Sequence, residues 1–371
     1  MTVEAPGFAR PRQIAPLDKR TEQAIATACP GTTISSWPDA PYVHEYWGPW
    51  IKTVTAHATD QRVRFAGSSG GMVTALAIHA LETGMVSRVL HIEADPDHPT
   101  RNVLTWSETA DALIAGAGSR YASSSPLADI DTALAAEGRF LFIGKPCDVS
   151  ALRQLAKSDP RVDQKVPLML SFFCAGVPSH AGADAVILDM GLDPTAVTRF
   201  RYRGNGWPGL TVAETADGAR GEMRYADSWG RHLSPRVQAR CKICPDGVGG
   251  VADLACADAW YGGETGYPQF EEQEGRSLTM ARTPAGAALL AAAEQAGRVV
   301  SSPLEVDQID LMQPGQVRRK RALRARIAGL RLIGKPVPVM QGLYVTQAGR
   351  RAPRRESFRN FVGIIRRRIR R

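Results

Sequence analysis

The sequence has no long apolar run and no apolar segment at its start. None of the hydrophobic stretches in its 371 residues approaches the ~18 residues that a membrane-spanning helix needs. The first residues, MTVEAPGFARPRQ, also lack the apolar core of a secretory signal peptide. We therefore expect a cytoplasmic protein whose six cysteines stay reduced, which excludes disulfide bonding as their expected role.

Several enzyme classes have no pattern in this sequence. No Ser/His/Asp set, paired-carboxylate site or Walker phosphate loop stands out, and no module that reads a DNA groove is recognisable, so no specific nucleic-acid partner is expected. The seven histidines are scattered. His79 lies inside a predicted helix, where a packed or surface role is expected. The residues that suggest chemistry are therefore the cysteines.

Four cysteines stand in three short segments. Cys147 lies in GKPC, Cys174 in FFCAG, and the pair Cys241 and Cys244 in RCKICPD. A CxxC pair on a turn can present two thiolates to one metal centre, and two further cysteines would complete the four-thiolate shell of an iron-sulfur cluster. A zinc ribbon usually supplies two local pairs, whereas here only one pair is local. The spacing alone leaves a cluster, a zinc site and the absence of metal as alternatives.

The remaining two cysteines are expected to be structural. Cys256 follows the CxxC segment closely and could be a spare ligand, but free cysteines are commonly buried. The same argument applies to Cys29, which precedes a proline.

The pattern of apolar residues predicts an α/β fold with mixed sheet domains. Residues 51–60 alternate as a strand does, and after the turn GSSGG residues 72–84 follow a helical period and residues 86–94 read as a strand. Further on, the predicted strands end at Cys147 and Cys174. Because cofactors collect beyond the carboxyl ends of strands in α/β sheets, these two cysteines are expected to lie close together. The other predicted segments are a helix over 129–138, a strand over 139–147, a helix over 148–157 and a strand over 166–174.

Composition shifts predict four parts in the chain. Residues 1–45 are rich in Pro, Gly, Ser and Thr and are expected to be an irregular extension. Residues 46–130 and residues 131–312 are predicted to form two α/β domains. Residues 313–371 are predicted to be a basic, partly amphipathic tail.

Two loops of small residues could approach an anion such as a flavin pyrophosphate. The first consists of Gly67, Ser68, Ser69, Gly70 and Gly71, directly before a predicted helix whose N-terminus favours negative charge. It is not a GxGxxG motif, and a simple helix cap is the alternative.

The second loop, over residues 116–126, adds hydroxyls, backbone donors and a cation. Its candidate cofactor-binding residues are Ser119, Arg120, Tyr121 and Ser124. Lys145, at the end of a predicted strand, could also meet a flavin or phosphate, although solvation is the common role of such a lysine. The aromatic residues dense around the last cysteine pair could shield a flavin or cluster from water, or could simply pack. They are Tyr202, Trp207, Tyr225, Trp229, Trp260 and Tyr261.

All of the excess positive charge of the chain lies in the tail, because the rest of the chain is net negative. Residues 317–371 contain 18 Lys and Arg and a single acidic residue, Glu356. The last stretch, ESFRNFVGIIRRRIRR, predicts a basic amphipathic helix. Three hypotheses remain for it: a solvated disordered end, a nucleic-acid arm, and a helix lying on an anionic membrane surface at the inner face. The apolar face is predicted to contain Phe358, Phe361, Val362, Ile365 and Ile369.

Six ordered motifs resemble one known family. They are SSGGMVTAL, GSRYASSSPL, GKPCDVSALR, FFCAGVPS, FRYRGNGWPG and RCKICPDGVGGVADLACADAW. Together, from about Gly67 to Pro284, they resemble the beta subunits of coenzyme F420 hydrogenases and dehydrogenases. The resemblance implies an oxidoreductase that holds FAD beside a 4Fe-4S cluster, with Cys147, Cys174, Cys241 and Cys244 as ligands and the two small-residue loops along the FAD. By this resemblance, residues 46–130 are expected to be a flavin-associated domain and residues 131–312 an iron-sulfur and flavin domain. A flavin beside a cluster converts between hydride and single-electron partners.

The resemblance leaves the donor and the substrate open. Many relatives carry an N-terminal ferredoxin-like segment with repeated CxxC spacing, whereas this chain retains only Cys29 there. We therefore expect a separate ferredoxin or other electron-transfer protein as partner, and a deazaflavin coenzyme or another reducible small-molecule or lipid-linked compound as substrate. The competing hypothesis is a non-enzymatic zinc-binding module whose basic tail binds a membrane or nucleic acid.

Overall fold

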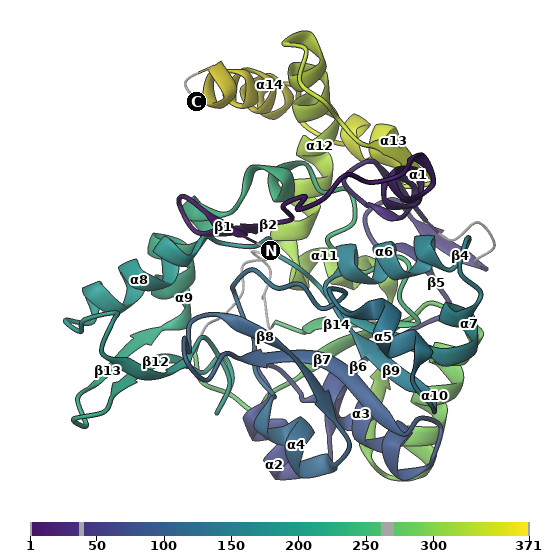
Figure 1. Ribbon diagram of the computed structural model, residues 1–371, viewed down its shortest axis with the longest axis vertical. Helices are drawn as coiled ribbons and strands as arrows, with labels where there is room; N and C mark the ends of the chain where they lie inside the picture. The colour runs from purple at the N-terminus through teal and green to yellow at the C-terminus, as the bar shows by residue number, and fades with distance from the viewer. Residues whose placement is uncertain (1, 37–40, 261–270, 370–371) are drawn as a thin grey trace.

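An eight-stranded mixed sheet forms the centre of the molecule (Figure 1). The computed structural model describes residues 2–36, 41–260 and 271–369. The strand order is β16-β6-β15-β14-β10-β9-β7-β8, in which the β14-β10-β9-β7 stretch is parallel and the other pairs are antiparallel. This confirms the predicted mixed α/β fold. The strands are β6 (Lys52–Ala58), β7 (Arg88–Ala94), β8 (Asn102–Ser107), β9 (Phe140–Ile143), β10 (Leu168–Phe172), β14 (Leu254–Asp258), β15 (Ser277–Ala281) and β16 (Val299–Pro303).

Helices cover both faces of this sheet, and the side chains of β9 show why. Phe140 and Phe142 pack into one core cluster while Leu141, between them, packs into the other, because successive residues of a strand point to opposite faces. A strand buried on both faces needs an uninterrupted apolar sequence, and FLFI provides it. The helices α5 (Ile130–Ala135), α6 (Pro146–Leu155) and α7 (Arg161–Lys165) lie on the face of the two phenylalanines.

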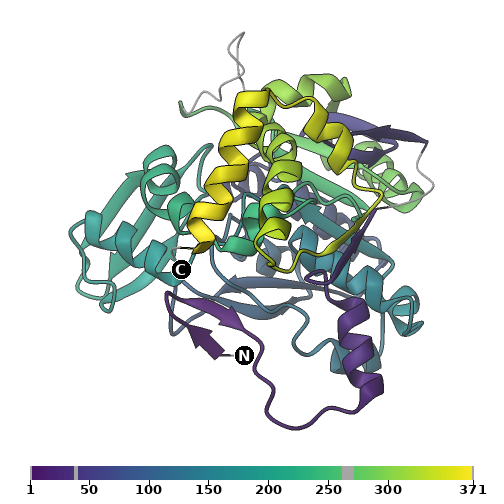
Figure 2. The same cartoon turned by 90° about the horizontal axis from the view of Figure 1, so that it is seen from above.

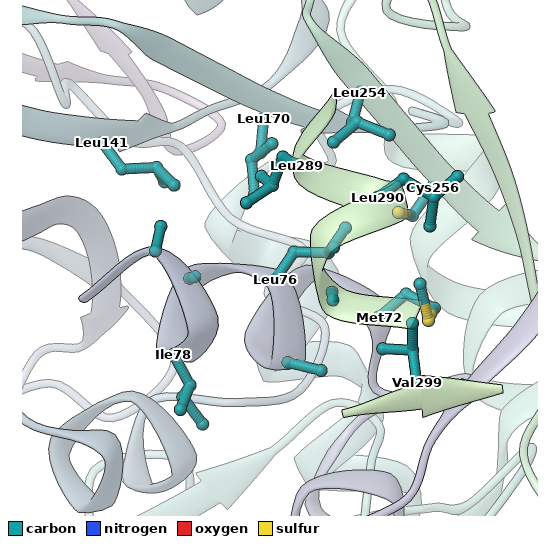
Figure 3. Packing of buried hydrophobic residues seen from close by; sticks show 14 of the residues in the cluster. Met72, Leu76, Ile78, Leu141, Leu170, Leu254, Cys256, Leu289, Leu290 and Val299 are labelled. Atoms are coloured by element: carbon teal, nitrogen blue, oxygen red, sulfur yellow. The ribbon is translucent and has the colours of Figure 1, made fainter. Parts of the chain in front are cut away.

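The opposite face carries the largest core cluster. Here α3 (Met72–Glu82) and α10 (Pro284–Gln295) press Leu76 and Leu289 against Leu254 of the sheet (Figure 3). Cys256 points into the same cluster and is 5 % exposed, which confirms its predicted burial. Two short helices, α2 (Gln61–Ala66) and α4 (Ala110–Ala115), flank α3.

A smaller lobe projects from the main sheet. It contains a three-stranded antiparallel sheet and α8 (His180–Asp189), followed by α9 (Tyr225–Asp227) and the π-helical turn η1 (Ser228–Leu233) (Figure 1). Val186, Ile187 and Phe200 form its buried core. The strands of this lobe are β11 (Val197–Arg201), β12 (Leu210–Thr215) and β13 (Arg220–Arg224).

The first 45 residues are more regular than predicted. Strands β1 (Thr2–Glu4) and β2 (Phe8–Arg10) pair, and the carboxylate of Asp18 accepts a hydrogen bond from the Thr21 N–H at the start of α1 (Lys19–Ala28). The prediction of an irregular extension is wrong for these segments. The missed signals were the N-terminal cap at Asp18 and pairing with a distant part of the chain, since β3 (Thr33–Ser35) pairs with β17 (Val339–Gln341). The hairpin of β4 (Tyr42–His44) and β5 (Gly48–Trp50) follows.

The basic C-terminal region is folded rather than disordered. Its helices are α11 (Ile309–Met312), α12 (Pro314–Leu332), α13 (Val345–Arg350) and α14 (Arg354–Ile369). Ile364 of α14 packs with Ile327 of α12, and seen from above α14 lies along the outer surface of the molecule (Figure 2). The hypothesis of a solvated disordered tail is therefore wrong over the described residues. No helix among residues 2–36, 41–260 and 271–369 is both long and apolar enough to cross a membrane.

Candidate functional site

A cavity of about 310 Å³ opens where the strands β9, β10 and β14 end. Lys145, Cys174 and Asp258 line it from these three neighbouring strand ends. Its volume is at the lower end of the range of small-molecule sites, and its place beyond the carboxyl ends of parallel strands is where α/β sheets bind ligands. We therefore expect the predicted site residues to line this cavity.

The two predicted small-residue loops meet at this cavity. The hydroxyls of Ser68 and Ser119 lie 2.7 Å apart and form a hydrogen bond between the loops. Gly71 has a φ of 75°, and a Cβ there would lie 2.8 Å from the backbone oxygen of Val63, so only glycine fits the turn into α3. No side chain caps the N-terminus of α3, and Met72, Val73 and Thr74 of its first turn line the cavity, so uncapped backbone N–H groups lie at the cavity wall.

Nine of the ten predicted cofactor-binding residues line the cavity. Gly70 is the exception, because it packs against the sheet: a Cβ there would lie 2.6 Å from the backbone oxygen of Ala56, and its N–H donates to the Ser277 hydroxyl at 2.9 Å. Ser69 lines the cavity, but its hydroxyl donates to the backbone oxygen of Arg276 at 2.9 Å. These two residues therefore fix the loop. The nine lining residues are Gly67, Ser68, Ser69, Gly71, Ser119, Arg120, Tyr121, Ser124 and Lys145.

Arg120 holds the second loop in place. Its guanidinium donates to the Asn102 side chain at 2.9 Å and to the backbone oxygens of Pro99, Arg101 and Phe200. Burial lowers the pKa of Arg120. Because four acceptor oxygens of the protein surround its guanidinium, Arg120 fixes the conformation of the loop that borders the cavity.

Lys145 supplies a positive charge at the cavity wall. Its ammonium donates to the Ser124 hydroxyl at 2.5 Å and to the Asp148 carboxylate at 2.7 Å. Burial has the largest single effect and lowers the pKa of Lys145, but Asp148 together with Cys147 and Cys174 outweighs it, so that the pKa of Lys145 is raised. Lys145 immediately precedes α6, so the loop that carries it also leads into the helix with Cys147.

A buried ion pair that the sequence patterns did not predict closes the other side of the cavity. Arg203 is 2 % exposed and contacts Asp258 through two hydrogen bonds of 3.0 Å, and it also donates to the backbone oxygen of Ser68 at 2.6 Å. The indole N–H of Trp207 donates to the same carboxylate at 2.7 Å. Both Arg203 and Trp207 lie in the FRYRGNGWPG motif, which was the only available signal.

Aromatic rings extend this ion pair along the wall. The guanidinium of Arg203 lies 4.3 Å from the ring centre of Tyr225, and Trp260 stacks on Trp207 with ring centres 4.8 Å apart. Tyr121 contacts Trp229 at 5.1 Å between ring centres. Of the predicted aromatic residues, Tyr225 and Trp260 line the cavity, whereas Trp207 and Trp229 pack against lining residues. Tyr261, named with it, lies outside the described residues.

Cys174 and Cys241 lie beside consecutive backbone donors. The N–H of Gly176 points to the sulfur of Cys174 at 3.4 Å and the N–H of Val177 to the sulfur of Cys241 at 3.5 Å. Burial, followed by the neighbouring Cys241, raises the pKa of Cys174 to about 12. A thiol with this pKa stays protonated at neutral pH unless a cation binds it.

The other two cysteines approach the same region. Burial and then Asp246 raise the pKa of Cys244, and Cys241 adds to the effect. Cys147 lies in the first turn of α6 and its side chain has exposed surface. Partial desolvation of its thiol, then Asp148, and more weakly Cys174 and Cys244 raise the pKa of Cys147. All four sulfurs thus interact electrostatically.

The four sulfurs do not converge tightly on one point. Within the described part of the chain, no three His, Cys, Asp or Glu side chains are placed to hold a single metal ion. This arrangement does not distinguish between a zinc ion and a cluster. An iron-sulfur cluster binds its cysteines at different iron atoms, so its ligands surround a larger core.

Comparisons with known proteins agree with the sequence motifs. The N-terminal model of the coenzyme F420 hydrogenase/dehydrogenase beta subunit matches residues 53–130 and the C-terminal model matches residues 137–307. The beta subunit of coenzyme F420 hydrogenase from Methanothermobacter thermautotrophicus is 24% identical over 301 residues, which cover 78% of this chain and 99% of that protein. Chloroplastic 7-hydroxymethyl chlorophyll a reductase from Oryza sativa is 26% identical over 234 residues, 63% of this chain and 47% of the reductase.

A solved structure shows the same fold. A chain of the F420-reducing NiFe hydrogenase complex from Methanosarcina barkeri superposes with a TM-score of 0.60 at 20% identity, covering 80% of this chain and 98% of that one. The family models together span more than half of the sequence. The chain therefore belongs to the coenzyme F420 hydrogenase/dehydrogenase beta subunit family, a family of oxidoreductases.

Proposed function

We propose that this protein is an iron-sulfur flavoprotein oxidoreductase, with FAD in the cavity and a 4Fe-4S cluster on Cys147, Cys174, Cys241 and Cys244. One observation carries the proposal: Cys174 lines the same cavity as both small-residue loops. A cluster on this cysteine would therefore share a wall with a flavin bound along the loops. The two groups would then be close enough to exchange electrons.

The cavity has the features that bind a flavin pyrophosphate. The uncapped N-terminus of α3 and the ammonium of Lys145 both present positive charge to it. The tight turn at Gly71 allows the backbone to approach a ligand closely. The aromatic residues Tyr121, Tyr225 and Trp260 supply flat apolar surface along the wall.

The cysteine region has the features that hold a cluster. Four thiols approach from three segments of the chain, and the N–H groups of Gly176 and Val177 point to two of the sulfurs. Such N–H donors stabilise the negative charge of cluster-bound sulfur and set its reduction potential. The raised pKa values of Cys174 and Cys244 fit thiols that ionise only when iron binds them.

When both groups are bound, the flavin supplies two-electron chemistry toward a substrate and the cluster supplies single electrons from a partner. The residues of this chain hold the two groups side by side and surround them with aromatic side chains. We propose a ferredoxin or similar electron-transfer protein as the donor. The substrate is a deazaflavin coenzyme or another reducible compound, either a small molecule or a lipid-linked one.

Anaerobic mixing with a reduced ferredoxin tests this function. We expect the absorbance of the bound flavin to bleach in the wild-type protein. In a Cys241→Ser variant that retains flavin, bleaching by ferredoxin should be lost, while a chemical two-electron reductant should still bleach the flavin. Equal bleaching by ferredoxin in both proteins would contradict the proposed route through the cluster.

Replacing Gly71 with alanine should release the flavin. The substitution places a side chain at positive φ, which costs roughly 1–2 kcal/mol, and brings a Cβ to 2.8 Å from a backbone oxygen at the turn into α3. We expect the ratio of flavin to protein after gel filtration to fall at least about fivefold, because 1–2 kcal/mol corresponds to roughly that change in an equilibrium constant.

Gly84 offers a matched control at the other end of the same helix. Its φ is 70°, and no atom lies within 4 Å of the point that a Cβ would occupy. Gly84→Ala should therefore carry a similar backbone cost and leave the flavin ratio unchanged. If both variants lose flavin equally, the loss reflects general destabilisation and the assignment of the Gly71 turn to flavin binding is wrong.

A further inference from the structure

The outer face of α14 combines exposed apolar side chains with a parallel row of arginines. Phe358 and Ile369 are each 71 % exposed and Val362 is 42 % exposed. Their spacings of four and seven residues place them on one face of a helix with 3.6 residues per turn. Three exposed arginines each lie three residues before one of these apolar residues: Arg355, Arg359 and Arg366. Residues three apart are neighbours on a helix surface, so the arginines run beside the apolar row. The arginine row consists of these three residues, and the apolar row consists of Phe358, Val362 and Ile369.

The packing of α14 fixes which face points outward. Gly329 of α12 lets the helices approach so closely that a Cβ there would lie 2.6 Å from the Ile364 side chain. Arg326 of α12 donates to the Asn360 side chain at 3.0 and 2.9 Å, and Ile364 is 4 % exposed. The sequence-based prediction placed Phe361 and Ile365 on the apolar face with the exposed residues and missed Ile364. In the structure, Ile365 packs toward α12 with Ile364, while the apolar row remains uncovered.

We infer that this face of α14 binds the surface of a bilayer that contains anionic lipids. A helix with bulky apolar residues on one face and arginines beside them binds in the interface, with the apolar side chains among the acyl chains and the cations at the headgroups. Glu356 is the one acidic residue in 317–371, so the charge of the face is complementary to an anionic surface. At 16 residues, α14 lies on the bilayer rather than across it.

The alternative occupant is an acidic electron-carrier protein, and the apolar row argues against it. Encounters between redox proteins bury little surface and depend on charge. They gain little from exposed apolar residues such as Phe358 and Ile369. These residues belong to α14, which lies at the outer end of the molecule (Figure 1). A bilayer buries such side chains without needing a complementary pocket.

Membrane binding through α14 would also position the redox site. From α12, which carries α14, the Gln316 amide donates to the backbone oxygen of Cys174 at 3.1 Å and Arg319 donates to the same oxygen at 2.8 Å. The helix against which α14 packs, α12, thus contacts the cysteine region directly. This last step rests on the proposed function, whereas binding to lipid does not.

Flotation of the full-length protein with vesicles tests the inference. We expect binding to vesicles of phosphatidylcholine with phosphatidylglycerol, weaker binding at high salt, and little binding to phosphatidylcholine alone. Replacing Arg355, Arg359 and Arg366 with glutamine should weaken binding about a hundredfold. Replacing Phe358 and Ile369 with serine should weaken it on the order of tenfold or more.

A matched control separates this face from exposed apolar residues in general. Phe65 and Leu188 are 59 % and 62 % exposed and lie far from α14 in the sequence, so their double serine variant should bind vesicles as the wild type does. All variants should keep the iron and flavin content of the wild type. Absence of binding by the wild type, equal binding by the α14 variants, or binding to an acidic ferredoxin that the same variants abolish would each overturn the inference.

Discussion

Replacing Cys244 with serine is expected to yield protein without the visible absorption of an iron-sulfur cluster. Cys244 follows the 3₁₀ turn η3 (Ala239–Ile243), and its thiol interacts electrostatically with Cys241. A serine oxygen is a poor substitute for a soft thiolate ligand of iron. We expect the iron content after anaerobic purification to fall from about four atoms per chain to close to none. The Cys147→Ser variant should behave in the same way.

Cys29 provides the matched control for this loss. It is also a free cysteine with intermediate exposure, but its sulfur accepts a hydrogen bond from the nearby Gly31 N–H at 3.3 Å, at the end of α1. The Cys29→Ser variant should keep its colour and its iron. Loss of iron in this variant, or full iron in Cys244→Ser, would contradict the assignment of the four ligands.

Replacing Asp258 with alanine is expected to lower the free energy of unfolding by roughly 3–5 kcal/mol, because it leaves a buried charge without its partner. Arg203 is 2 % exposed and forms its ion pair with Asp258, and Trp207 loses an acceptor at the same time. Urea denaturation monitored by circular dichroism measures the change. Because Arg203 and Asp258 line the cavity, the flavin content should fall as well.

A surface ion pair of the same chemistry controls for the loss of a carboxylate. Arg220 lies 2.6 Å from Glu222, and their side chains are 53% and 44% exposed. Exposed pairs contribute less than about 1 kcal/mol. The Glu222→Ala variant should therefore unfold close to the wild-type urea concentration. Similar shifts in the two variants would show that the pair of Arg203 and Asp258 does not stabilise the protein as a buried pair does.

The sequence predicted the central elements because their signals are local. The period of apolar residues identified β6, α3, β7, β9, α6 and β10. Cys174 follows the end of β10 as predicted, but the prediction that a strand runs to Cys147 is wrong, because β9 ends at Ile143 and Cys147 lies in the first turn of α6. The resemblance to the family rests on short motifs of the same kind. Two of these motifs form the loops that meet through Ser68 and Ser119.

Features that depend on distant partners could not be predicted in this way. Arg203 and Asp258 are 55 residues apart, and only the folded chain shows that they pair. The role of Arg120 is similar: its loop suggested a ligand, but its acceptors include Phe200 of the small lobe. The pairing of β3 with β17 joins segments about 300 residues apart in the sequence, and no local pattern in residues 1–45 indicates this pairing.

The face of α14 illustrates the limit for a single helix. The periodicity of the sequence predicted an amphipathic helix, and the structure confirms that a helix forms. The periodicity alone could not show which apolar residues of α14 would be buried, because their burial depends on Gly329 and Arg326 of the neighbouring α12. Burial of Ile364 and exposure of Phe358 follow from this contact.

Cofactor analysis of the wild-type protein, purified without oxygen, tests the central claim most directly. The measurement combines iron, acid-labile sulfide, zinc and extractable flavin per chain with an electron paramagnetic resonance spectrum of the reduced protein. We predict about four iron and four sulfide per chain, one FAD, and the signal of a reduced 4Fe-4S cluster. A colourless protein with one zinc per chain and no flavin would contradict the account.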